Sequence, residues 1–526
     1  MSPPAVPSAK RAPSRRIRLA RAGLFATVFV VAACGLVYEL ALITLGAYLV
    51  GNTATQASIV LSVMVFAMGL GALAAKPLQK RPALSFAAIE LVLAALGGFS
   101  VLLLYAAFAW TALYNVPLIA VASLIGLLVG AEIPLLMELL QRIRKQAAGA
   151  AVADLNAADY LGGLVGGLAF PFLLLPVFGQ IRGALLVGAV NAVAGVVLIF
   201  LLFRDDLSRM SRQLLALAAG AIAIVLAGAF VYTDRFEVAA RQQLYSAPIV
   251  YSEDTRYQQI VMTESASPFG DTDFRLYLDG DLQFSSVDEY RYHEALVHPV
   301  MNGPRGDVLV LGGGDALAVR EILRYPDVET VTLVDLDETV TNLARDFDEL
   351  VALNGGALAD PRVAVANEDA FTWLREQGST YDAIVVDMPD PDATETAKLY
   401  SVEFYALAGA HLNPQGRMVV QGGSPYFAPK TYWTIAATLE EAGYAATSYQ
   451  ASVPSFGDWG FHAVQASGEA PVVSLDPAVG PLRSLTPELL EAAQVFPPDR
   501  TRMDMEPSTL IHPVIVDIVA SEWRHY

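Results

Sequence analysis

The sequence predicts two parts of different fold class: a multi-span α-helical membrane domain, and an α/β Rossmann-like domain preceded by a small β-hairpin subdomain. Three observations support this division. Long apolar runs fill residues 22–232, short alternating strands follow in 246–292, and strands then alternate with helices over 293–470. Residues 1–232 hold 16 Lys and Arg against 8 Asp and Glu, whereas the remainder holds 18 against 45. The chain of 526 residues is also too long for one core.

A basic, Pro- and Ser-rich tail over residues 1–21 opens the chain. The apolar run after it is too long for the core of a cleaved signal peptide, and more runs follow, so we expect an uncleaved anchor. About seven runs reach the roughly 20 residues that a membrane-spanning helix needs. They lie near 23–50, 56–78, 84–108, 113–140, 157–178, 182–203 and 211–232.

Basic residues gather in alternate loops of this half. They are Lys76, Lys80 and Arg81, then Arg142, Arg144 and Lys145, then Arg204, Arg209 and Arg212. The positive-inside rule places these loops and the N-terminus in the cytoplasm. We therefore expect a multi-pass protein of the cell (inner) membrane in contact with the lipid bilayer. Seven crossings favour an extracytoplasmic acidic half, whereas one re-entrant segment would leave it in the cytoplasm.

Carboxylates and glycines interrupt the apolar runs. The acids are Glu39, Glu90, Glu132, Glu138, Asp154 and Asp159. Buried acids in a membrane are costly, so they indicate either a path or binding site for cations, or partners in helix packing. The stretch YLGGLVGGLAF, residues 160–170, repeats glycine every four residues and predicts close packing of two helices.

The acidic second half excludes some classes of partner. Its negative charge repels nucleic acid and favours cationic ligands, so we expect no nucleic-acid binding. The single cysteine, Cys34, excludes an internal disulfide. The histidines do not have metal-ligand spacing, and no metal site is predicted.

The second half reads as a parallel sheet with acids at its strand ends. Strands in 307–314, 329–337, 362–369, 381–390 and 416–423 alternate with helices. Ligands bind at the carboxyl ends of such strands. The acids found there are Asp315, Asp335, Asp369 and Asp387.

The spacing of two acids indicates an adenosine ligand. Gly312, Gly313 and Gly314 make a glycine-rich turn, and Asp335 follows about 20 residues later, where an acid binds the two ribose hydroxyls. Asp315 stands where the methionyl carboxylate of S-adenosylmethionine would approach, and it would repel that group. A ligand that ends in a bare ammonium, decarboxylated S-adenosylmethionine, would instead be attracted.

Several motifs resemble the spermidine synthase (polyamine aminopropyltransferase) family over roughly residues 246–470. They are YQQI, LYLDGDLQFSSVDEYRYHE, GGGDALAVREIL, VTLVDLD, NEDA, DMPDPD, LYSVEFY and VPSFGDWGF. The apolar half resembles a subset fused to a multi-span membrane domain. The resemblance implies an S-adenosylmethionine-methyltransferase-like domain that transfers the aminopropyl group of decarboxylated S-adenosylmethionine to putrescine or a related amine. The products are spermidine and 5′-methylthioadenosine, and soluble members form a homodimer or a higher homo-oligomer.

The resemblance also implies residue roles. Asp387 is the proton acceptor, and a carboxylate suits this role because the amine arrives protonated. Asp390, Tyr292 and Gln283 lie on the acceptor-amine side. The donor binds to Gln258, His293, Gly312, Gly314, Asp315, Asp335, Asp369 and Ala370.

The sequence departs from the family pattern in three places. Ala316 and Leu317 replace two glycines, Ala370 replaces another, and the segment after Asp390 lacks the usual Gly-Pro. Two alternatives remain open: a membrane methyltransferase acting on an amine or lipid, which Asp315 argues against, and a polyamine transporter or sensor with a non-catalytic domain. Residues 471–526 form a tail without an assigned function.

Overall fold

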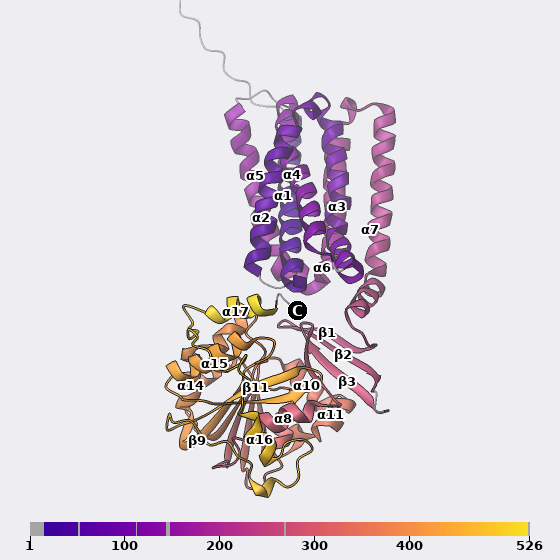
Figure 1. Cartoon of the computed structure of the whole chain (residues 1–526). Helices are drawn as coiled ribbons and strands as arrows, with labels where there is room; N and C mark the ends of the chain where they lie inside the picture. Colours follow the sequence, from indigo (N-terminus) through magenta and orange to yellow (C-terminus); the bar gives the residue numbers. More distant parts are fainter. Residues whose placement is uncertain (1–14, 51–52, 112, 144–147, 268–269, 524–526) are drawn as a thin grey trace, which may run out of the picture. The chain divides into compact units, whose positions relative to one another are not determined.

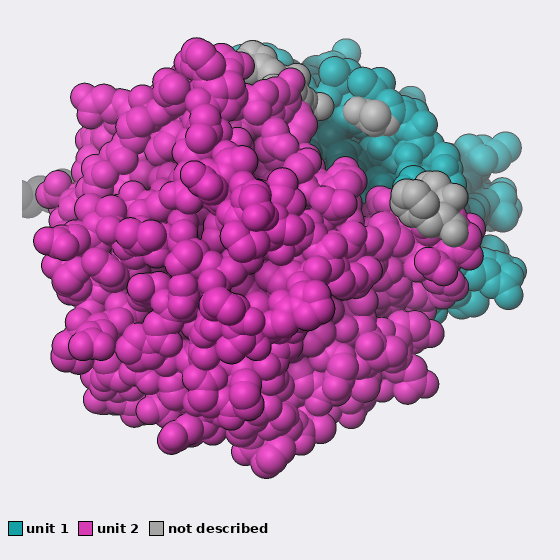
Figure 2. Space-filling model, turned by 60° about the horizontal axis from the view of Figure 1, so that its bottom comes forward, with its two compact units in different colours: residues 1–246 teal, residues 247–526 magenta. Residues whose placement is uncertain are grey.

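A computed structural model describes the chain except for residues 1–14, 51–52, 112, 144–147, 268–269 and 524–526. The chain divides into two compact units, residues 1–246 and 247–526 (Figure 2). Lys10 and Arg11 of the predicted basic tail lie outside the described residues, whereas residues 15–21 already belong to the first helix.

Unit 1 is entirely helical where it is described. Its long helices are α1 (Arg15–Val50), α2 (Thr53–Ala74), α3 (Pro82–Thr111), α4 (Asn115–Ile143), α5 (Ala148–Ala169), α6 (Leu175–Leu202) and α7 (Arg209–Leu244). By length and composition, six continuous helices in the described part could cross a membrane, and the longest, Val152–Leu202, combines α5 with α6. At about 1.5 Å per residue, it would exceed twice the roughly 30 Å hydrocarbon thickness. Gly179 has non-helical angles, φ 70° and ψ −178°, and divides it between the two runs predicted there.

Three ion pairs join the ends of these helices. They are Arg21–Asp154, Arg142–Asp206 and Arg182–Asp234, with N–O distances of 2.9, 3.1 and 2.6 Å. The first two connect the start of α1, the end of α4, the start of α5 and the α6–α7 loop. The third connects the start of α6 to α7 beyond its apolar part, at the opposite end of the bundle (Figure 1). The chain therefore enters unit 1 at one end and leaves it at the other.

The glycine repeat brings α5 against α1. A side chain at Gly162 would collide with the carbonyl oxygen of Phe29, and one at Gly166 with that of Ala33. The predicted close packing of two helices is therefore present, because only glycine permits this backbone approach.

Unit 2 begins with an antiparallel sheet in the order β1-β2-β3-β4. The strands are β1 (Ile249–Asp254), β2 (Gln259–Ala266), β3 (Thr272–Leu278) and β4 (Asp281–Ser285). Asp279 and Gly280 join β3 to β4 with φ of 51° and 97°. Positive φ at both positions is what the favoured two-residue hairpin turn requires.

A seven-stranded sheet forms the centre of unit 2, in the order β10-β11-β9-β8-β5-β6-β7. Its strands are β5 (Asp307–Gly312), β6 (Thr330–Asp335), β7 (Val363–Asn367), β8 (Tyr381–Asp387), β9 (Leu412–Gln421), β10 (Thr447–Val453) and β11 (Gly457–Gln465). Strands β5 to β9 are parallel, β11 pairs antiparallel with β9, and β10 pairs antiparallel with β11. The strand order reverses between β5 and β8, and such a switch point opens a crevice for ligands.

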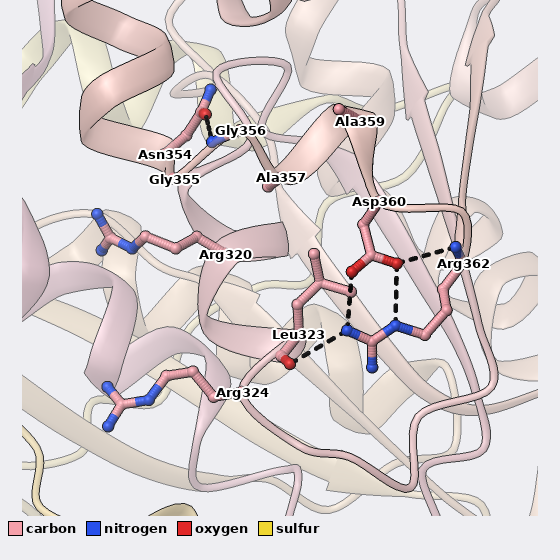
Figure 3. A pocket seen from close by; sticks show the side chains of 10 residues that line it. All are labelled: Arg320, Leu323, Arg324, Asn354, Gly355, Gly356, Ala357, Ala359, Asp360 and Arg362. Atoms are coloured by element: carbon pink, nitrogen blue, oxygen red, sulfur yellow. Dashed lines mark hydrogen bonds and ion pairs between the residues drawn. The ribbon is translucent and has the colours of Figure 1, made fainter.

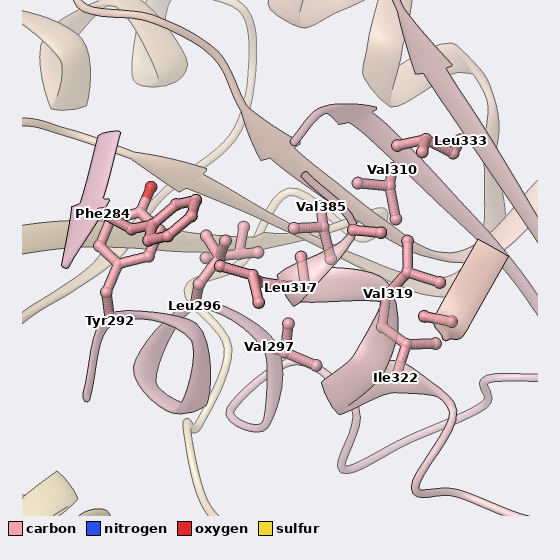
Figure 4. Packing of buried hydrophobic residues seen from close by; sticks show 14 of the residues in the cluster. Phe284, Tyr292, Leu296, Val297, Val310, Leu317, Val319, Ile322, Leu333 and Val385 are labelled. Carbon is pink, nitrogen blue, oxygen red and sulfur yellow. The ribbon is translucent and has the colours of Figure 1, made fainter. Parts of the chain in front are cut away.

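Helices cover both faces of this sheet, so the strands are apolar on both sides. The helices are α8 (Glu289–Val297), α9 (Leu317–Ile322), α10 (Glu338–Asp346), α11 (Asp348–Asn354), α12 (Ala370–Glu376), α13 (Thr394–Ala397), α14 (Val402–Ala410), α15 (Pro429–Glu441), α16 (Pro487–Ala493) and α17 (Val514–Trp523). On one face, α8 and α9 pack against Val310, Leu333 and Val385 (Figure 4). On the other, Ile515 and Val519 of α17 are buried in the apolar cluster, where α17 packs against α13 and α15, so residues 471–526 form part of unit 2.

Candidate active site

The glycine turn and Asp387 lie side by side at the switch point. Gly312 ends β5 and is the register partner of Asp387, which ends β8. Gly312 has φ 80°, and a side chain there would collide with the carbonyl group of Asp387. Glycine is therefore required at this position, and the sheet itself fixes the separation of the turn from the carboxylate.

Asp387 is a half-buried carboxylate that accepts a hydrogen bond from a phenol. The hydroxyl of Tyr292 donates a hydrogen bond of 2.5 Å to Oδ1. Burial raises the pKa of Asp387 to about 6, opposed by His293 and by the Tyr292 bond. A side chain at Gly313 would lie 3.0 Å from Oδ2, so this oxygen faces the glycine turn. At neutral pH, Asp387 is thus an ionised base with one oxygen directed to the crevice.

A network of charged side chains lies next to Asp387. His293 Nδ1 lies 2.9 Å from Glu289 Oε2, and Arg320 donates two hydrogen bonds of 2.8 and 2.9 Å to the same carboxylate. Burial acts to lower the pKa of His293, but the Glu289 carboxylate outweighs it and the pKa is raised. The resulting positive charge stabilises the anionic forms of Asp315 and Asp387. Glu289 was not predicted from sequence, because it lies inside a helix and not at a strand end.

Asp315 directly follows the glycines and is 9% exposed. Its Oδ1 accepts a 2.9 Å hydrogen bond from the amide of Leu317. Burial raises its pKa, and the charge of His293 opposes this effect. The glycine turn ends at Ala316, which follows Asp315 and has φ 67°. The family that the motifs resemble often has glycine at this position. The turn therefore forms despite this departure, with a modest backbone strain at Ala316.

Asp335 ends β6 beside the glycine turn. Its two oxygens accept 2.9 Å hydrogen bonds from the amides of Gly314 and Asp337. Burial raises its pKa to about 6. A side chain at Gly314 would lie 2.6 Å from Asp335 Oδ2, so glycine is needed here as well. Gln258, from the segment before β2, donates a 3.2 Å hydrogen bond to Asp337 Oδ2 and so joins this group.

Asp369 is already engaged by neighbouring groups. It accepts a 2.9 Å bond from the amide of Thr372, and it pairs with Lys398 Nζ at 2.5 Å. Burial acts to raise its pKa, but Lys398 holds the pKa below the ordinary value. Ala370, the next residue, begins α12 and is buried. The structure places this pair one strand beyond Asp335, at the end of β7.

A second carboxylate lies just after β8. Asp390 Oδ1 accepts a 3.2 Å hydrogen bond from Gln421 Nε2, and Trp459 Nε1 donates to Gln421 Oε1 at 3.1 Å. Burial raises the pKa of Asp390 to about 6. Gln421 was not predicted as a site residue, although it ends β9 at the same edge of the sheet. Its position directly after an apolar run was the sequence feature that could have indicated it.

Gln283 lies on β4, two residues after Asp281. Its amide donates a 3.2 Å bond to the carbonyl oxygen of Asp281 in its own strand. Asp281 itself was not predicted. Burial raises its pKa to about 7, and the charges of Asp392 and Asp390 contribute. Asp281 thus belongs to the electrostatic environment of Asp390.

A separate pocket of about 410 Å³ opens elsewhere in unit 2 (Figure 3). Its lining residues are Arg320, Leu323, Arg324, Asn354, Gly355, Gly356, Ala357, Ala359, Asp360 and Arg362. Its three arginines already pair with Glu289, Glu321 and Asp360. None of the strand-end acids lines it, so we assign the chemistry to the switch point.

The fold and the strand-end acids together define a class: an α/β protein whose sheet carries several carboxylates at its switch point, which is typical of a ligand-binding crevice. Comparison with known proteins specifies the family. A Spermine/spermidine synthase domain matches residues 289–477. The chain is 56% identical over 509 residues to polyamine aminopropyltransferase 1 of Streptomyces coelicolor, covering 97% of this chain and 96% of that one. It is 48% identical over 513 residues to polyamine aminopropyltransferase of Mycobacterium tuberculosis, covering 96% and 97%.

The chain therefore belongs to the polyamine aminopropyltransferase family, as its motifs predicted. The crystal structure of spermidine synthase from Thermotoga maritima also matches, with a TM-score of 0.40 and 23% identity. That match covers 47% of this chain and 84% of the other.

Proposed function

We propose that this protein is a membrane-anchored polyamine aminopropyltransferase that uses decarboxylated S-adenosylmethionine as donor and putrescine or a related diamine as acceptor. One observation carries the proposal: a half-buried carboxylate, Asp387, is fixed next to a glycine turn that presents a second, buried carboxylate, Asp315. The aminopropyltransferase names of relatives that match almost the whole chain support this activity.

The donor fits the groups around the glycine turn. Asp335 would hold the ribose hydroxyls with Gln258 close by, and Asp369 with Ala370 would border the adenine. Asp315 would pair with the primary ammonium of the aminopropyl chain in a site where water is largely excluded. His293 would border the same chain through Nε2, because its Nδ1 is engaged by Glu289.

The acceptor fits the groups around β8 and β9. Its far ammonium would pair with Asp390, which Gln421 positions, and Asp281 would add to the attraction. Its reacting nitrogen would pass a proton to Asp387 Oδ2 and attack the carbon beside the sulfonium. The C–S bond then breaks, and its electron pair goes to sulfur, leaving neutral 5′-methylthioadenosine. No negative charge develops on the leaving group, so an oxyanion hole is not required.

For the membrane half, we propose seven crossings with the start of α1 in the cytoplasm. The division at Gly179 and the three ion pairs support an odd number. The basic loops support the orientation. The C-terminus would then be extracytoplasmic. C-terminal fusions to alkaline phosphatase and to green fluorescent protein test this assignment. An inactive phosphatase fusion and a fluorescent green fluorescent protein fusion would place the C-terminus in the cytoplasm and refute the assignment.

The function is tested by calorimetry and product analysis on the purified full chain. We expect decarboxylated S-adenosylmethionine to bind more tightly than S-adenosylmethionine. Asp315→Asn should reduce this ratio of affinities at least tenfold, which corresponds to about 1.4 kcal/mol. Asp307→Asn is the matched control, because Asp307 starts the same strand and its Oδ1 accepts a hydrogen bond from Thr330. Tighter binding of the intact methionine form, or a product heavier by one methyl group, would refute the proposal.

A further inference from the structure

The membrane unit contains a buried polar cluster that aminopropyl transfer does not use. It consists of Tyr38 on α1, Glu90 on α3, Glu132 on α4 and Asn191 on α6. Asn191 bonds to Glu90, and Tyr38 and the two glutamates lie within electrostatic range of one another. Tyr38, Glu90 and Asn191 are 0% exposed, and Glu132 is 5% exposed. Four helices thus each direct one polar side chain into the interior of an otherwise apolar bundle.

Close packing fixes these side chains in place. Asn191 Nδ2 donates to Glu90 Oε2 at 2.9 Å and to the Glu90 carbonyl oxygen at 3.3 Å. One turn further on α6, a side chain at Gly195 would lie 2.5 Å from Cβ of Glu90. A side chain at Gly97 of α3 would lie 2.6 Å from the ring of Tyr38. The glycines let the helices approach closely, so the cluster is rigid.

Four oxygens of the cluster have no hydrogen-bond partner among the described residues. They are Tyr38 Oη, Glu90 Oε1, Glu132 Oε1 and Asn191 Oδ1, all fully shielded from solvent. Within the described chain, neither glutamate forms an ion pair with a Lys, Arg or His side chain. The other titratable groups in electrostatic range are Cys34 and Asp159, which are also acids. Uncompensated acceptors at this depth are costly, so the cluster would be stabilised by a positive charge.

We propose that this cluster binds a small monovalent cation, Na⁺. Carboxylate, amide and phenol oxygens are the ligands that hard cations prefer. The tight contact of α3 with α6 around Glu90 favours an ion of small radius over an organic amine.

The first test is the thermal stability of the purified full chain in lipid nanodiscs, with NaCl exchanged for choline chloride at constant ionic strength. A bound ion stabilises the folded state by mass action, so Na⁺ is expected to raise the Tm of unit 1 by several degrees at pH 8. Glu90→Gln and Glu132→Gln should abolish the shift. Glu39→Gln, which changes a half-buried acid on α1 outside the cluster, should retain it. Gel filtration and far-UV circular dichroism establish that each variant is folded.

The second test needs only the wild-type protein. Dicyclohexylcarbodiimide modifies protonated carboxyl groups in apolar surroundings, and mass spectrometry locates the adduct. We expect an adduct on Glu90 or Glu132 at pH 6 that decreases at pH 8. Protection of the carboxyl groups by Na⁺ would support the proposal. A pH-dependent adduct that Na⁺ does not reduce, together with a Tm that does not change with Na⁺, would overturn it.

Discussion

Replacing Asp387 by asparagine removes the proposed base without changing its shape. The amide oxygen of the introduced asparagine can still accept the Tyr292 hydrogen bond, so the local packing is preserved. Loss of a positioned general base costs typically 10²- to 10⁴-fold in rate, about 2.7–5.4 kcal/mol of transition-state stabilisation. We therefore expect kcat to fall by at least 100-fold while the affinity for the donor stays within about threefold.

The pH dependence gives an independent measure of the same group. Burial raises the pKa of Asp387 to about 6, so the wild-type enzyme should lose activity as the pH falls through about 6. One unit below the pKa, roughly a tenth of the base is ionised. This acidic limb should be absent from Asp387→Asn, because no carboxyl group is left to protonate.

The assay measures 5′-methylthioadenosine from decarboxylated S-adenosylmethionine and putrescine by mass spectrometry between pH 5 and 9. Asp382→Asn is the matched control. Asp382 lies near the amino end of the same strand, where it accepts bonds from Asn413 and from the amide of Asp307. The reasoning would be refuted by an Asp387→Asn variant that keeps more than a tenth of wild-type kcat, or by an acidic limb near pH 6 that survives the substitution.

Three further substitutions test other parts of unit 2. Gly314→Ala places a methyl group 2.6 Å from Asp335 Oδ2, so KM for the donor should rise about tenfold; an unchanged KM would contradict the ribose assignment. Tyr292→Phe removes a bond that lowers the pKa of Asp387, so the acidic limb should move to higher pH; a shift to lower pH would exclude this role. Glu321→Gln should cost on the order of 2–3 kcal/mol in urea unfolding followed by tryptophan fluorescence, because bonds from His298 and two arginines overcome burial and lower its pKa to about 2. That difference should be full above pH 4.5 and shrink towards pH 2, and a pH-independent difference would disprove its electrostatic origin.

Local patterns predicted the fold class of unit 2 because its central strands, such as β5 and β8, are buried on both faces. The run before Gly312 is apolar at every position, which is typical of a central parallel strand. The strand order could not be predicted in this way. Strand β8, and not β7, lies next to β5 because of contacts between residues some 75 positions apart, and no local pattern encodes those contacts. The break at Gly179 was predicted only as a gap between two apolar runs.

The acids that follow strands could be predicted because parallel strands end at one edge of the sheet. Asp315, Asp335 and Asp387 are of this kind. The groups that tune them could not, because Glu289 comes from a helix and Gln421 comes from a strand more than 30 residues after Asp387. The ion-pair partner of Asp369 could not be predicted either. Lys398, 29 residues further along the chain, pairs with it, and no spacing rule anticipates that pair.

The register pairing of Gly312 with Asp387 leaves the reaction centre without a hinge. Asp387, the proposed base, and the glycine turn belong to adjacent strands of one hydrogen-bonded ladder, so we expect thermal motion to displace them together. The proposed acceptor side differs, since residues 388–401 connect β8 to α14 outside the sheet. We therefore expect substitutions in residues 388–401 to change the length of amine that is accepted while the spacing of Gly312 and Asp387 stays the same.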